Sequence, residues 1–134
     1  MPYHIAWHDA AQTIVRQTYQ GRISRCDFEG MVRDSRILLD SVPHIVDVII
    51  EWQGDRHLIN DFSIIHAAMF AEKNVPHNQR FVFVVNAPTA YRILASVLQK
   101  AAPRAVGALY FVDTMEAMSR LREILLETEL TPVS

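Results

Sequence analysis

Apolar and polar residues alternate along two short segments at the start of the chain. Residues 3–8 place aromatic and branched side chains at every second position, and residues 13–20 form a second segment rich in β-branched residues, which Gly21 ends. A period of two is typical of a strand with one buried face. Because only a short polar break separates the two segments, they predict an antiparallel hairpin.

The apolar spacing then changes to the three- and four-residue period of helices. Ser24, with Asp27 three residues later, predicts a capped helix that ends near Asp40. Asp113 and Glu116 resemble an aspartate version of the same capping box and predict the start of a final helix. The other two predicted helices begin with caps at Asp61 and Thr89.

Three nearly continuous apolar runs predict strands that are buried on both faces, as in a parallel sheet. These runs are residues 45–52, 81–85 and 108–112. The predicted order is therefore β-β-α-β-α-β-α-β-α, and strands that alternate with helices favour parallel pairing. We expect an α/β domain with a mixed, mostly parallel sheet packed with helices. Its length of 134 residues is typical of a single domain over residues 1–134.

Composition narrows the classes of function. The net charge is −2 and no run of Lys or Arg occurs, which argues against a nucleic-acid partner. Cys26 is the only cysteine, so no intramolecular disulfide forms, and we expect it to be partly buried and unreactive. No signal sequence is apparent, and no apolar run approaches the ~20 residues of a membrane span, so we expect a cytoplasmic protein without membrane insertion.

The residues that suggest chemistry do not form a catalytic or metal-binding pattern. No glycine-rich phosphate loop occurs, and we expect no cofactor. His57, Asp61 and His66 lie close in sequence, but their spacing places them on different faces, which argues against a metal site. Ser63 and His66 share a helix at a spacing that seldom gives the geometry of a triad, so we expect no enzyme activity. Asp47 is expected at a strand end or paired with a basic group, because an unpaired buried carboxylate is costly.

Five landmarks follow one another in a characteristic order. The first is a glycine turn at residues 19–23, which leads into the first predicted helix. The second and third are the predicted strand at 46–52 and the start of a helix at 60–64. The fourth is the segment 81–86, which precedes another predicted helix, and the fifth is the closing strand and helix at 110–117. In this order the chain resembles the STAS-like family, the domain of anti-sigma-factor antagonists and sulphate-transporter tails. The resemblance implies a STAS-like β-β-α-β-α-β-α-β-α domain, bacterial and regulatory, that binds a protein partner.

The segment that opens the second helix occupies the place of the family's Asp-Ser-Ser-Gly signature. In the antagonists, the serine after the aspartate is phosphorylated, which switches partner binding. Asp61 matches the aspartate and Ser63 the second serine, whereas Phe62 stands at the phosphoacceptor position and Ile64 replaces the glycine. The resemblance makes Ser63 the candidate for phosphorylation. It implies a partner-binding surface formed by Asp61, Phe62, Ser63 and His66.

A regulatory or scaffold domain that binds a protein partner is the leading hypothesis, with two alternatives. The first is a small-molecule or lipid carrier with a pocket between the sheet and the helices. That pocket would be lined by Met31, Met69, Phe70 and Met118. The second is a hydrolase that uses Ser63 with His66, or Asp61 with His57, as the reacting pair. Apart from these functions, an apolar face on the final strand and helix also suggests a homodimer.

Overall fold

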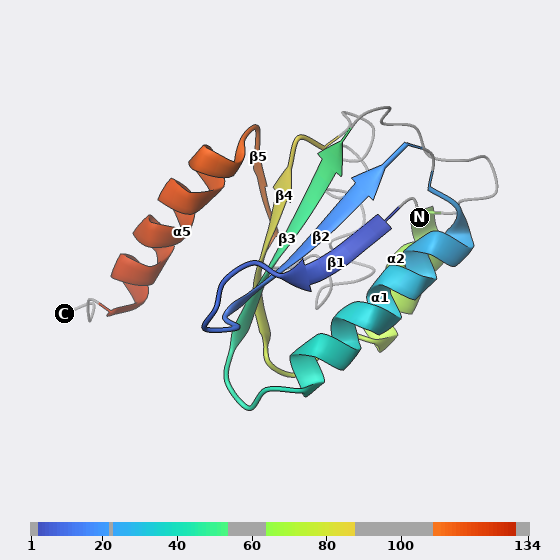
Figure 1. The fold of residues 1–134 in the computed structure, drawn as a ribbon, viewed down its shortest axis with the longest axis horizontal. Helices are drawn as coiled ribbons and strands as arrows, with labels where there is room; N and C mark the ends of the chain where they lie inside the picture. The colour runs from blue at the N-terminus through green and yellow to red at the C-terminus, as the bar shows by residue number, and fades with distance from the viewer. Residues whose placement is uncertain (1–2, 22, 54–63, 88–108, 131–134) are drawn as a thin grey trace.

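The computed structural model describes residues 3–21, 23–53, 64–87 and 109–130. These residues form strands and helices in the order β-β-α-β-α-β-β-α (Figure 1). The strands are β1 (Tyr3–Trp7), β2 (Ile14–Gln20), β3 (Val46–Gln53), β4 (Gln79–Val85) and β5 (Leu109–Val112). The helices are α1 (Arg25–Asp40), α2 (Ile64–Lys73) and α5 (Met115–Leu130). The predicted caps at Asp61 and Thr89 lie outside the described residues.

The described strands form one sheet in the order β1-β2-β3-β4-β5. β1 runs antiparallel to β2, and every later pair is parallel. This confirms the predicted α/β class with a mixed, mostly parallel sheet. Because each crossover leads to the next strand in the same direction, crossovers of the same hand place their helices on one face. Figure 1 shows α1 and α2 together on one side of the sheet and α5 on the other.

A carboxylate closes the predicted hairpin between β1 and β2. The Asp9 side chain accepts hydrogen bonds from the backbone N–H of Thr13 (2.9 Å) and of Ile14 (3.1 Å), and also from the Thr13 hydroxyl. Burial alone would raise the pKa of Asp9, but these hydrogen bonds outweigh it and hold the pKa below its ordinary value. β2 then ends at Gly21, whose φ of 67° lies in the left-handed region that glycine adopts without strain.

The first helix has the predicted cap. The Ser24 hydroxyl accepts a hydrogen bond from the backbone N–H of Asp27 (3.1 Å), and the Asp27 carboxylate accepts one from the Ser24 N–H (3.0 Å). These two bonds form the reciprocal capping box, which satisfies two backbone donors that a helix N-terminus leaves unpaired. The sequence alone therefore located the start of α1 correctly.

The predicted cap of the last helix is wrong by one residue. α5 begins at Met115, and the Thr114 hydroxyl accepts the hydrogen bond from the Ala117 N–H (3.1 Å). Glu116 forms an ion pair with Arg120 one turn later (2.7 Å). Both Asp and Thr are good N-cap residues, so the local sequence was compatible with either start.

Two apolar clusters lie on opposite faces of the sheet. On the α1 side, Met31 and Leu39 pack with Val15, Val48 and Val84, and Tyr19 and Trp52 lie with ring centroids 5.0 Å apart. On the α5 side, Met118 is fully buried against a second set of strand residues. That set is Ile14, Ile49, Phe81, Phe83 and Val85. Each face of the sheet is thus buried by different helices.

Candidate functional site

The structure describes one of the residues predicted to bind a partner. His66 lies in α2 and is exposed to solvent. Asp61, Phe62 and Ser63 lie outside the described residues, and so does His57, the partner of Asp61 in the alternative reacting pair. The predicted roles of these four residues therefore stay predictions.

His66 belongs to a row of exposed residues on the outer side of α2. Met69 and Lys73 follow it at intervals of three and four residues, which place side chains on one face of a helix. Met69 is 49% exposed, and both polar residues beside it are exposed as well. We call His66, Met69 and Lys73 the α2 stripe. It presents one flexible apolar side chain between two polar ones.

Two contacts with α1 fix the position of the helix that carries the α2 stripe. The Arg33 guanidinium lies over the ring of Phe70, 5.2 Å from its centroid, which is cation–π geometry. Arg36 donates a hydrogen bond to the Asn74 side-chain oxygen (3.2 Å). Ile37, four residues after Arg33 and on the same side of α1, is 66% exposed. Both helices of the pair therefore carry an exposed apolar side chain, Met69 on α2 and Ile37 on α1.

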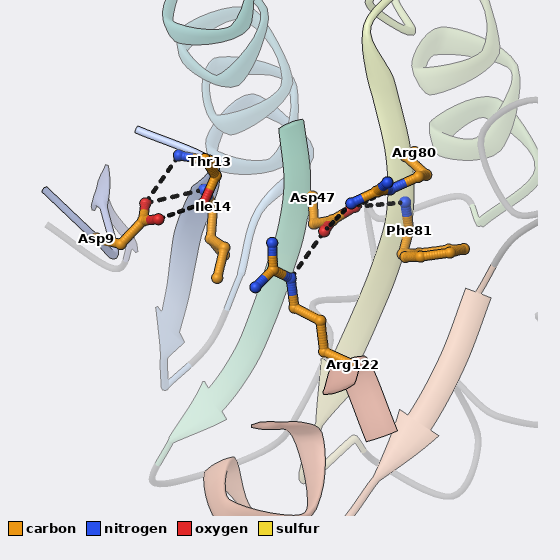
Figure 2. Close-up of polar contacts among 7 residues, drawn as sticks. All are labelled: Asp9, Thr13, Ile14, Asp47, Arg80, Phe81 and Arg122. Atoms are coloured by element: carbon orange, nitrogen blue, oxygen red, sulfur yellow. Dashed lines mark hydrogen bonds and ion pairs between the residues drawn. The ribbon is translucent and has the colours of Figure 1, made fainter. Parts of the chain in front are cut away.

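A second cluster of functional groups surrounds Asp47 on the other face of the sheet (Figure 2). Its carboxylate is fully buried, and it accepts hydrogen bonds from the backbone N–H of Phe81 (3.1 Å) and from two arginines. Arg80, on β4, donates through Nε and Nη2, both at 2.9 Å. Arg122, on α5, donates through Nε at 2.8 Å. The prediction that Asp47 pairs with a basic group is confirmed.

The surroundings of Asp47 determine its protonation state. Burial alone would raise the pKa of Asp47, but the hydrogen bonds from Arg80, Arg122 and the Phe81 N–H outweigh it and lower the pKa. A carboxylate that is ionised and accepts four hydrogen bonds is a poor general base, because a base needs a pKa near the working pH and access to the proton. Asp47 therefore acts structurally, by joining β3, β4 and α5.

Sequence reasoning did not identify the two partners of Asp47. Arg80 and Arg122 lie 33 and 75 residues from Asp47 along the chain. No local motif links residues so far apart, and the chain contains several other arginines of similar surroundings. Only the register of β3 against β4, and the face of the sheet that α5 covers, bring the three side chains together.

Polar side chains also connect β2 with β3. Arg16 forms an ion pair with Glu51 (2.5 Å), and Gln53 donates a hydrogen bond to the same carboxylate (3.0 Å). Gln20 in turn donates to Gln53 (3.0 Å). These groups satisfy one another, so they stabilise the pairing of β2 with β3 without offering a reactive group.

Two expectations about individual residues can be compared with the structure. Cys26 is exposed in the first turn of α1. The prediction of a partly buried thiol is therefore wrong. Met31 and Met118 belong to the clusters on opposite faces of the sheet, and Met69 is exposed, so the proposed lining of a carrier pocket does not come together. Among the described residues, no group of three or more His, Cys, Asp or Glu side chains could hold a metal ion.

Comparison with known proteins leaves the site to be interpreted from its own geometry. No family model, curated protein or solved structure matches the chain. None of the helices in the described ranges is both long enough and apolar enough to cross a membrane.

Proposed function

We propose that this chain is a non-catalytic regulatory or scaffold domain that binds a protein partner through the α2 stripe and the adjoining surface of α1. The observation that carries the proposal is the exposure of Met69, 49%, on a helix whose next residue, Phe70, is held under Arg33. Methionine is enriched in protein interfaces because its flexible, polarisable side chain adapts to a partner surface.

The surroundings of Met69 have the composition of an interface. Interfaces commonly have an apolar centre and a polar rim. Here His66 and Lys73 flank Met69 along the helix, and Ile37 adds an exposed apolar side chain on α1. The contacts of α1 with Phe70 and Asn74 hold the surface in place before binding, which reduces the entropy lost on association.

The resemblance to the STAS-like family supports the same surface. In that interpretation Asp61, Phe62 and Ser63 bind the partner together with His66, and the partner is a sigma-regulatory or kinase-like protein. A phosphate on Ser63 would gain from the helix dipole and lose through repulsion from Asp61, so phosphorylation would alter partner affinity.

The experiment compares two exposed apolar residues on opposite faces of the sheet. Met69→Asp places a charge at the centre of the proposed interface, and Ile124→Asp is the matched control, since Ile124 on α5 is 58% exposed. A partner captured from native lysate by the unmodified chain is purified, and its affinity for each variant is measured by calorimetry. We expect Met69→Asp to weaken binding at least tenfold, about 1.4 kcal/mol, and Ile124→Asp to leave it unchanged.

Two results would refute the proposal. One is the capture of no defined partner by the unmodified chain. The other is an equal effect of Met69→Asp and Ile124→Asp on affinity, because it would place the interface elsewhere or make the loss nonspecific. Circular dichroism of both variants establishes that each retains its fold.

A further inference from the structure

β1 forms one end of the sheet (Figure 1), and within the described part of the chain no strand pairs with its outer edge. The His8 N–H donates to the Ile14 carbonyl oxygen (2.8 Å), where the hydrogen bonding between β1 and β2 begins. In an antiparallel pair, every second residue bonds to the neighbouring strand, and the residues between direct their N–H and C=O groups the other way. In the register of this pair, the residues whose backbone groups point away from β2 are Tyr3, Ile5 and Trp7.

β1 lacks the features by which proteins commonly protect an edge strand. Such strands often carry a lysine, a proline or a β-bulge, each of which obstructs pairing with a further strand. β1 has the sequence Tyr-His-Ile-Ala-Trp and pairs with β2 in an unbroken register over its 5 residues. The edge is therefore able to accept another strand.

The residues whose backbone groups point outward also carry the apolar side chains of β1. Tyr3, Ile5 and Trp7 pack at the margin of the core on the α1 side and are only half-buried. His4 and Ala6 alternate with them, so their side chains lie on the opposite face of the sheet, where both are exposed. A strand added at this edge would extend the apolar layer under α1 and bury aromatic surface that one chain leaves in contact with water.

A second copy of β1 fits this edge because the strand is self-complementary. Antiparallel pairing about a twofold axis at Ile5 places Ile5 opposite its own copy and Tyr3 opposite Trp7 of the copy. All of these residues direct their backbone groups outward, so about six hydrogen bonds form without any shift in register. The aromatic and β-branched side chains then form cross-strand pairs on one face, which add to the stability of the pairing.

The position of α1 is compatible with this pairing. α1 packs against both β1 and β2. Because neighbouring strands lie ~4.8 Å apart, a helix over the gap between β1 and β2 lies about 5 Å from the twofold axis. The two copies of α1 would therefore lie about 10 Å apart on the same face of the joined sheet, which is close to the distance at which helices pack.

We propose that two copies of this chain associate by antiparallel pairing of β1 with β1, which joins the two sheets into one. This surface lies at the end of the sheet opposite to β5 and α5, whose apolar face suggested a homodimer from the sequence. The pairing does not involve the α2 stripe and does not depend on the function proposed for it.

Amide hydrogen exchange, followed by NMR over a range of protein concentrations, tests the pairing. The Ala6 N–H bonds to β2 within one chain, so its exchange should be slow at every concentration. The N–H groups of Ile5 and Trp7 bond only to the copy. We expect their exchange to slow over the same concentrations at which sedimentation equilibrium shows the dimer forming.

Two double variants test the register of the pair. His4 lies opposite Ala6 of the copy, and both side chains are exposed, so substitutions there spare the core. His4→Lys with Ala6→Lys places like charges opposite one another on both sides of the axis, whereas His4→Lys with Ala6→Glu places opposite charges there. We expect the dissociation constant of the first variant to exceed that of the second about tenfold. Circular dichroism establishes that both variants retain the fold.

Two results would overturn the proposal. One is a chain that stays monomeric at concentrations up to about 1 mM and whose Ile5 N–H exchanges rapidly throughout, which would leave the edge to an extended segment of another protein. The other is a dimer from which the two double variants dissociate equally, because the copies would then associate through a different surface.

Discussion

Replacing Asp47 with asparagine keeps the shape of the side chain and removes its charge. The amide retains one acceptor, which can serve the Phe81 N–H. Its NH₂ group, however, must face nitrogens of Arg80 or Arg122, where a donor meets a donor. Asp47→Asn therefore removes the carboxylate charge that two guanidinium groups share, and the side chains of these arginines are only 24% and 20% exposed.

The expected loss of stability follows from this exposure. Removing one partner of a buried ion pair costs about 3–5 kcal/mol. Because both arginines keep some access to water, we expect the lower end, about 3 kcal/mol. A domain with a typical stability of about 5–15 kcal/mol remains folded after this loss, so the variant can be measured.

The assay is equilibrium unfolding in urea, followed by circular dichroism, with Glu51→Gln as the matched control. Glu51 also pairs with an arginine, but Arg16 is 36% exposed, and a pair of this kind contributes at most about 1 kcal/mol. A loss below about 1 kcal/mol for Asp47→Asn, or one no larger than that of Glu51→Gln, would contradict the structural role of the cluster.

Two further predictions concern acid stability and the packing of α1. Since the pKa of Asp47 is lower in the folded chain than its unfolded value of about 3.9, its contribution is present above that value and is lost as pH falls through the folded pKa. Urea midpoints should therefore fall more steeply below about pH 4 in the unmodified chain than in Asp47→Asn, and parallel curves would argue against this assignment. A methyl group added at Gly30 would lie 2.7 Å from the Tyr3 hydroxyl oxygen, which donates to Asp34. Gly30→Ala alone should therefore raise the free energy of unfolding only a little. In a Tyr3→Phe background, which removes the hydroxyl group, the higher helix propensity of alanine should raise that free energy by up to about 1 kcal/mol. Equal effects in both backgrounds, measured by thermal unfolding, would refute the contact.

The parts of the fold that the sequence predicts correctly are those set by local pattern. The hairpin follows from alternation and a glycine, and the start of α1 follows from Ser24 and Asp27, because these signals lie within a few residues of one another. The start of α5 was misplaced because Asp113 and Thr114 are both suitable caps. The partners of Asp47, the exposure of Cys26 and the separation of the methionines depend on which face each helix covers. Periodicity identifies an apolar stripe but does not say which face of the sheet receives it.

The bond between Arg122 and Asp47 also bears on the order in which the chain can acquire its structure during synthesis. Proteins emerge from the ribosome with the N-terminal segment first. The strands β1 to β4 and their helix α1 are therefore available before α5 has been made. Until then, the apolar face around Phe83 has no α5 side chains against it, and Asp47 lacks one of its two arginines. A nascent chain that stalls before α5 is made thus exposes an aromatic surface that chaperones or proteases can recognise. Once α5 is made and packs on the sheet, it covers that surface.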